Sequence, residues 1–176
     1  MNPLDWLEIA TDIQAGADLI GLGISRHQSV FRDSQAQSLV HLFDEMVTSQ
    51  DLVDATRQLF VDGHYANAVE DAFKCLNNSV KEKSRISDDG DSLMRRAFSA
   101  KSPILKLNPF QSESDRNEQR GYMDIFAGAM TGIRNPRAHE HEIADDPETA
   151  LEMLIIANHL MRKLEHSTLA SSDDSQ

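Results

Sequence analysis

The stretch RNPRAH places Arg134 five positions before His139, with Asn135 and Pro136 between them. A guanidinium stays charged and can hold two phosphate oxygens through parallel hydrogen bonds. An imidazole can take up or release a proton near neutral pH. These two side chains are therefore sufficient for metal-free cleavage of RNA by its own 2'-hydroxyl group. A helix end with charged residues is the structural alternative.

Pro136 decides whether both side chains can face one target. On an unbroken α-helix, residues five apart point about 140° away from each other. Proline lacks a backbone donor and disfavours helical geometry at the residue before it. We therefore predict that the helix ends near Ile133 or Arg134 and that the chain turns there. The turn would bring His139 beside Arg134 and leave Asn135 to cap it or to bind a ligand.

Structural roles are open for each residue of this stretch. Arg134 can pair with Asp124 or neutralise the carbonyl end of its helix. His139 can be an exposed loop histidine, and Asn135 before a proline is an ordinary turn residue. Arg137 offers either a second phosphate contact or a solvated side chain.

The same stretch offers four ligands for a divalent transition metal: His139, Glu140, His141 and Glu142. Histidines two apart share a face only on an extended segment. A stable site also needs a further ligand, for which His64 and His159 are candidates. Because lone histidines near helix ends are usually structural, a metal hydrolase is the weaker hypothesis and we expect no cofactor.

Length and composition bound the class of protein. The 176 residues, 40% of them hydrophobic, suit one globular domain with an added helical segment. A lone cysteine, Cys75, allows neither a disulfide framework nor a cysteine-based zinc site. The first residues carry acids where a signal peptide would be basic, and no apolar run has membrane-spanning length. We expect a soluble, cytoplasmic protein without a membrane partner.

The charge is unevenly distributed. The chain carries a net charge of -12, but residues 74–106 hold 8 basic and 4 acidic side chains. This basic segment can form a phosphate-attracting surface, and a solvated helix face explains it equally well. Its candidate RNA-binding residues are Arg95, Arg96 and Lys101. The acidity elsewhere suits solubility or a basic protein partner.

Apolar residues recur at spacings of three and four, and no stretch alternates as a strand does. Four amphipathic helices are expected within SQDLVDATRQLFVDGHY, HYANAVEDAFKCLNNSVKEKS, EQRGYMDIFAGAMTGIRNP and DDPETALEMLIIANHLMRKLEHS. Gly63 is placed for a chain reversal, and Gly128 and Gly132 permit a close helix approach. The sequence therefore predicts an all-α four-helix bundle.

Three further segments complete the expected organisation. The polar connection at 87–119 carries a short helical piece near residues 93–98. Residues 1–50 form an N-terminal extension with two helices, around residues 4–13 and 39–46. The bundle itself covers 51–166, and the tail 167–176 is expected to be disordered.

RNPRAH matches the R-x4-6-H signature of the HEPN superfamily and stands after an apolar helix, as it does in that superfamily. The stretches GHYANAVEDAFK, RGYMDIFAGAMTGIRNPRAHE and ALEMLIIANHLMRKL resemble the Ymh-type branch of uncharacterised bacterial and phage-associated proteins. The resemblance covers roughly residues 51–166. It implies a HEPN-like four-helix bundle, here with additional N-terminal helices.

The resemblance also implies a function. It points to a homodimer whose two motifs meet in a cleft, and to a metal-independent endoribonuclease of phage defence, abortive infection or toxin–antitoxin systems, with an antitoxin or defence-system partner. Arg134 and His139 would be the catalytic pair, and Asn135 its polar support. The expected products carry a 2',3'-cyclic phosphate and a 5'-hydroxyl. Because some members have lost catalysis, the alternative is a non-catalytic dimeric module that binds RNA, a nucleotide or a partner protein.

Overall fold

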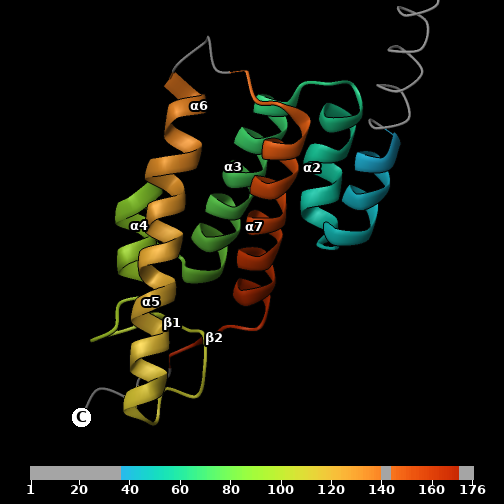
Figure 1. Cartoon of the computed structure of the whole chain (residues 1–176). Coiled ribbons are helices and arrows are strands. Elements are labelled where there is room, and N and C mark those ends of the chain that lie inside the picture. Colours follow the sequence, from blue (N-terminus) through green and yellow to red (C-terminus); the bar gives the residue numbers. More distant parts are fainter. Residues whose placement is uncertain (1–36, 140–143, 171–176) are drawn as a thin grey trace, which may run out of the picture. The chain divides into compact units, whose positions relative to one another are not determined.

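The computed structural model describes residues 37–139 and 144–170, and these residues are mostly helical (Figure 1). The described residues from Val40 onward belong to one compact unit. A helix at residues 37–46 precedes the labelled elements. These are α2 (Gln50–Val61), α3 (Tyr65–Ser84), α4 (Gly90–Ala97), β1 (Leu105–Lys106), α5 (Glu113–Ala129), η1 (Met130–Arg134), α6 (Asn135–His139), α7 (Pro147–Glu165) and β2 (Thr168–Leu169). The predicted all-α class is confirmed.

Helix α3 is the central element, because it packs against α2, α7, η1 and α4. Its predicted apolar stripe is buried at Ala68, Val69, Ala72, Phe73, Leu76 and Val80. Gly63 adopts a φ of 81°, which lets the chain reverse between α2 and α3, as predicted. Burial of this continuous stripe contributes to the hydrophobic stabilisation of the bundle.

The connection between α3 and α5 is shorter than the sequence suggested. Helix α4 confirms the short helical piece, and α5 begins at Glu113. Ser112 and Asp115 start α5 with a reciprocal capping box. The buried Gln119 then holds the loop, since its amide accepts from the Leu107 N–H and donates to the Leu105 carbonyl, both at 2.9 Å. The loop is therefore fixed against α5.

Pro136 does not end the helix, and the predicted break near Ile133 or Arg134 is wrong. Helix α5 passes into a π-helical turn, η1, in which the Asn135 N–H bonds to the Met130 carbonyl five residues back. Helix α6 then continues through Pro136 to His139. The wider turn changes the hydrogen-bond ladder just before the proline, where an ordinary helix would have a clash and a missing donor.

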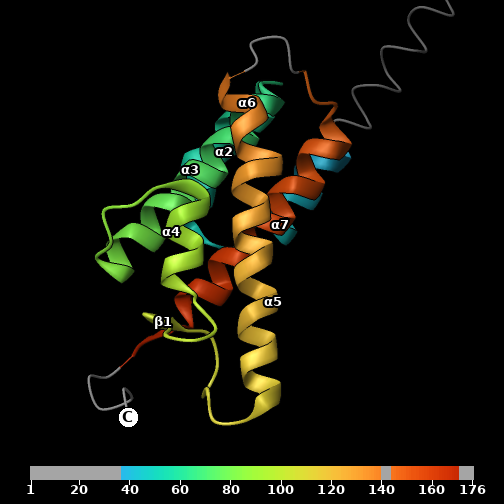
Figure 2. The same ribbon diagram turned by 90° about the vertical axis from the view of Figure 1, so that its left-hand side faces the viewer.

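Helix α7 begins as predicted, with Pro147 in its first turn and the Asp146 carboxylate accepting from the Thr149 N–H at 2.8 Å. It runs antiparallel to α5 (Figures 1 and 2). After α7, β2 pairs with β1 as an antiparallel ladder. The predicted disordered tail therefore starts too early at residue 167, and residues 171–176 lie outside the described part.

The compact unit starts at Val40, earlier than the predicted boundary at residue 51. The buried Asn158 of α7 holds the segment before α2, donating to the Met46 carbonyl and accepting from the N–H groups of Thr48 and Ser49, each at 2.9 Å. The helix expected around residues 39–46 is confirmed. The one expected around residues 4–13 lies outside the described residues.

Several large apolar residues of the predicted helices are exposed. Ile125 of α5 is 50% exposed and Ile156 of α7 is 39% exposed. The glycines of α5 and η1 are also open: a Cβ added at Gly121, Gly128 or Gly132 would meet nothing within 4 Å among the described atoms. The close approach expected at Gly128 and Gly132 is therefore not made among residues 37–139 and 144–170.

Candidate functional site

Arg134 ends η1 as a half-buried side chain with spare hydrogen-bonding capacity. Its Nη1 donates to the Asn135 Oδ1 at 3.3 Å, while its Nε is buried and has no partner among the described residues. The alternative pairing with Asp124 is wrong, because that carboxylate accepts from Arg95 at 3.0 Å. An unpaired buried donor is costly, so its presence marks a place where a ligand oxygen would be stabilised.

Asp89 forms a polar cluster with Asn77 and Lys81, and its carboxylate lies close enough to Arg134 for these two charges to interact. Asn77 donates to Asp89 at 2.5 Å and accepts from the Gly90 N–H at 3.0 Å, which ties α3 to the start of α4. The Lys81 Nζ lies 3.6 Å from the Asp89 carboxylate. Burial alone would raise the pKa of Asp89, but Asn77, Lys81, Gly90 and Arg134 together hold it below its usual value.

Sequence reasoning missed this cluster. The only signal was an asparagine, Asn77, inside the otherwise apolar stripe of α3, where it is 5% exposed. A buried amide needs partners, so its position indicated a tertiary hydrogen bond without revealing which residue supplies it. Asp89 lies in the next element along the chain, beyond the left-handed turn at Arg85.

His139 is exposed at the end of α6 and makes no hydrogen bond or ion pair with the part of the chain that the structure describes. Because α6 is regular between Asn135 and His139, the predicted chain reversal that would place His139 beside Arg134 does not occur. Arg134 interacts with the Asn77 cluster, while the imidazole stays open to solvent. Each side chain can thus be approached by a ligand, but the chain does not turn back to unite them.

Arg137 is engaged in the fold. Its guanidinium donates to both oxygens of Asp145, at 2.6 and 2.7 Å, and to the Ile133 carbonyl at 2.8 Å. The two charged side chains are only 9% and 8% exposed. The expectation of a solvated Arg137 is wrong, and a phosphate contact gains no support because the side chain is buried and three of its N–H donors are engaged in the fold. The pair joins α6 to the segment before α7.

The other candidate RNA-binding residues lie on the surface of α4 and the loop after it. Arg95 pairs with Asp91 and Asp124, and Arg96 pairs with Asp88 at 3.3 Å. Such exposed pairs contribute little stability and can exchange for a phosphate. Lys101 is exposed. The structure therefore leaves these three cations accessible, with neighbouring carboxylates offsetting two of them.

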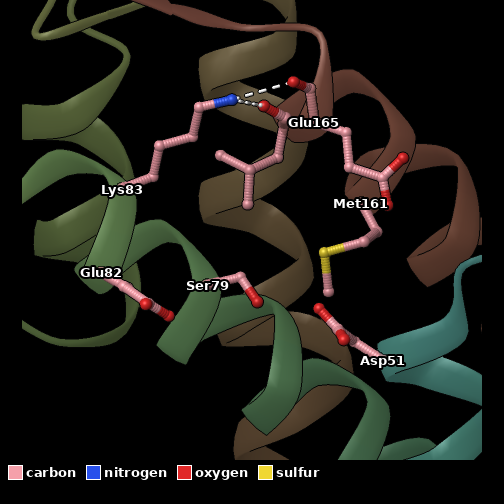
Figure 3. A pocket seen from close by; sticks show the side chains of 7 residues that line it. Asp51, Ser79, Glu82, Lys83, Met161 and Glu165 are labelled. Carbon is pink, nitrogen blue, oxygen red and sulfur yellow. Dashed lines mark hydrogen bonds between the residues drawn. The ribbon is translucent and has the colours of Figure 1, made fainter.

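A cavity of about 360 Å³ lies among α2, α3 and α7 (Figure 3). Three carboxylates line it, those of Asp51, Glu82 and Glu165. Its single cation, Lys83, donates to the carbonyls of Leu164 and Glu165 at 2.6 and 2.9 Å and so caps the end of α7. The acidic lining makes this cavity unsuitable for RNA phosphates.

The metal hypothesis gains no ligand set within residues 37–139 and 144–170, where no group of three or more histidine, cysteine, aspartate or glutamate side chains is placed to hold an ion. Its proposed ligands Glu140, His141 and Glu142 lie outside the described residues. Burial and, to a smaller extent, the negative charge of Asp51 raise the pKa of the Cys75 thiol. The reactive thiolate form of Cys75 is therefore disfavoured.

The described residues thus form a helical protein. Its half-buried Arg134 and exposed His139 lie near the end of the long helix formed by α5, η1 and α6. The model of the Hypoth_Ymh family, described as a protein of unknown function, matches residues 47–164. The chain therefore belongs to the Hypoth_Ymh family. No curated protein and no solved structure matches it. Among the described residues, no helix is long and apolar enough to cross a membrane.

Proposed function

We propose that this protein is a metal-independent endoribonuclease of the HEPN type that acts as a homodimer. The observation that carries the proposal is the state of Arg134. This guanidinium is half-buried and forms no ion pair with a described residue, and its Nε lacks a partner. An arginine held in this way is prepared to bind an oxyanion, and His139 follows on the same continuous helix.

In the proposed reaction the 2'-oxygen of the RNA attacks the adjacent phosphorus and loses its proton to a His139 imidazole. The bond from phosphorus to the 2'-oxygen forms as the bond to the 5'-oxygen breaks, and the leaving oxygen takes up a proton. Arg134 holds the non-bridging oxygens, where negative charge gathers. Asn135 restrains Arg134 through its hydrogen bond. In a dimer, one chain's His139 supplies the base and the other's supplies the acid.

Features of α5 support the homodimer. Gly121, Ile125 and Gly128 of α5 and Gly132 of η1 recur at spacings of three and four along the exposed surface of this continuous helix. A glycine inside a helix costs about 1 kcal/mol relative to alanine, and the described atoms offer these three no packing reason. Close approach of the α5 from a second chain would supply that reason. It would also bring two copies of the Arg134–His139 segment into one cleft.

The setting follows from the resemblance to HEPN proteins. A ribonuclease of this type would act in phage defence, abortive infection or a toxin–antitoxin pair, under the control of an antitoxin or another defence protein. The second candidate is a non-catalytic dimeric module that binds RNA, nucleotide or protein. The proximity of Asp89 to Arg134 favours this candidate, because a carboxylate near the guanidinium weakens its hold on phosphate.

The test is cleavage of end-labelled single-stranded RNA by the purified full chain in excess EDTA. Arg134→Ala and His139→Ala should abolish cleavage. Arg134→Lys should retain little activity, because lysine lacks the planar guanidinium that binds two phosphate oxygens. His64→Ala is the matched control, since His64 is exposed at the start of α3, outside the motif. The products should carry 2',3'-cyclic phosphate ends, and DNA should stay intact.

Two results would reject the ribonuclease. One is equal cleavage by the parent and both alanine variants, which would identify a contaminating nuclease. The other is RNA binding that depends on Arg134 without cleavage of any RNA in a varied set, which would favour the binding module. Loss of parental cleavage in EDTA, with recovery on adding a divalent metal, would instead support the metal hydrolase.

A further inference from the structure

A second cavity, of about 300 Å³, has an unusual lining for so acidic a chain. Four of its five lining residues are basic, and together they are Leu107, His159, Arg162, Lys163 and His166. The basic residues recur at positions i, i+3, i+4 and i+7, so they share one face of the last two turns of α7. The cavity therefore concentrates cationic groups within a protein of net charge -12.

Helix-end electrostatics explain part of this stripe. Cations near a helix C-terminus interact favourably with the helix dipole. Lys163 also has a carboxylate partner, because its Nζ lies 2.9 Å from Glu118, and it sits 4.4 Å from the centroid of the Tyr122 ring. The carbonyls of Leu164 and Glu165 at this helix end, however, are already capped by Lys83. The helix end thus needs no further cation.

The interactions at the helix end do not involve the side chains of Arg162 and His166. Both are exposed, and neither side chain forms an ion pair or hydrogen bond with any residue in the described ranges. The nearby Glu165 carboxylate accepts from the Ser49 hydroxyl at 3.2 Å, so it is held toward α2. His159 uses its Nε2 in a 2.8 Å hydrogen bond with the Tyr122 hydroxyl, which leaves its other ring nitrogen for a ligand.

The apolar part of the lining is Leu107, which hydrogen bonds hold in place. Leu107 enters the cavity from the loop just after β1, and the buried Gln119 binds its N–H. The same glutamine amide donates to the Phe98 carbonyl at 3.2 Å and to the Leu105 carbonyl at 2.9 Å. The pairing of β1 with β2 holds the loop from its other side. These hydrogen bonds therefore fix the position of Leu107 in the lining of the cavity.

We propose that this cavity binds the phosphate group of a small phosphorylated ligand of nucleoside monophosphate size. Arg162 and His166 hold the phosphate oxygens, while His159 and Lys163 add positive charge at the rim. Leu107 provides the apolar surface that the organic part of the ligand covers. A volume near 300 Å³ lies at the lower end of the range for small-molecule sites and exceeds the needs of a simple anion.

This site is separate from Arg134. Tyr122, which marks the level of the cavity on α5, lies twelve residues before Arg134, about 18 Å along a helix. In both views α6 continues from the C-terminal end of α5, whereas β1 lies near its N-terminal half (Figures 1 and 2). The proposed binding thus needs neither cleavage nor the dimer.

The test is calorimetric titration of the full chain at low ionic strength with inorganic phosphate, AMP and adenosine. AMP and phosphate should bind and adenosine should not. Arg162→Gln should weaken AMP binding by about tenfold, since one charge-assisted contact is lost. Arg116→Gln is the matched control: Arg116 is exposed on α5, does not line the cavity, and its replacement removes the same charge.

Histidine side-chain NMR signals would locate the ligand. On titration with AMP, the signals of His159 and His166 should move, while those of His41 and His64, which lie outside the cavity, should not. No binding of phosphate or AMP would overturn the proposal, as would equal weakening by Arg116→Gln. Binding of a deoxyoligonucleotide without binding of AMP would also overturn it, in favour of a nucleic-acid contact. None of these outcomes bears on RNA cleavage.

Discussion

Replacing Arg137 by methionine tests whether this arginine serves the fold rather than the substrate. The side chain is 9% exposed and donates to both Asp145 oxygens and to the Ile133 carbonyl. Removing it leaves a carboxylate that is 8% exposed without its counter-charge. Breaking a buried pair in this way costs about 3–5 kcal/mol. That is a large part of the roughly 5–15 kcal/mol that stabilises a typical domain.

The assay is urea unfolding of the full chain at neutral pH, followed by circular dichroism. Arg57→Met is the matched control, because Arg57 also forms a bidentate pair, donating to both Asp44 oxygens at 2.7 and 2.9 Å. Those side chains are 43% and 41% exposed, so water replaces the lost partner. We expect the midpoint to fall sharply for Arg137→Met and to change far less for Arg57→Met.

A double variant keeps the test interpretable when Arg137→Met folds poorly. Arg137→Met with Asp145→Leu removes both charges, and apolar replacement of a buried pair is often neutral or stabilising. The double variant should therefore recover most of the lost stability. Equal destabilisation by Arg137→Met and Arg57→Met, or a double variant less stable than Arg137→Met alone, would refute the reasoning that burial sets the cost.

Two further predictions concern α5 and the Asn77 cluster. Gly128→Leu should stabilise the isolated chain by about 1 kcal/mol through its higher helix propensity. In sedimentation velocity the same variant should shift the dimer toward monomer, because the larger side chain blocks close approach of a second α5. An unchanged dimer would exclude α5 as the interface. Asp89 has a depressed folded-state pKa, so its stabilising contribution is present at neutral pH and is lost as the pH falls below about 4. The stability difference between the parent and Asp89→Asn should shrink from pH 7 to pH 3, and a constant difference would contradict the assignment.

The elements of this fold were largely predictable from local pattern. The stripe from Ala68 to Val80 is buried, Gly63 reverses the chain, and Pro147 begins α7. Each depends on the chemistry of a few neighbouring residues, such as apolar spacing along a helix or the conformational freedom of glycine. The exposed Ile125 and Ile156 show the limit of this method, because periodicity identifies an apolar face without identifying what covers it.

The candidate site was predictable in composition and not in geometry. RNPRAH named Arg134 and His139, and the proline rule predicted a turn between them. The π-helical turn overrode that rule, because Asn135 can bond five residues back while the helix is held against α3. The pairing of Arg137 with Asp145 likewise joins α6 to the segment before α7, which no local pattern indicated.

The sequence by itself determined which residue types are present and where helices form, because both follow from chemistry within a few positions along the chain. Only the tertiary structure decided which polar groups are satisfied. It joined Asn77 to Asp89 and paired Arg137 with Asp145, and it left the Nε of Arg134 without a partner among the described residues. The physical reason is that hydrogen bonds and ion pairs depend on distances between elements, which packing sets and local sequence does not encode.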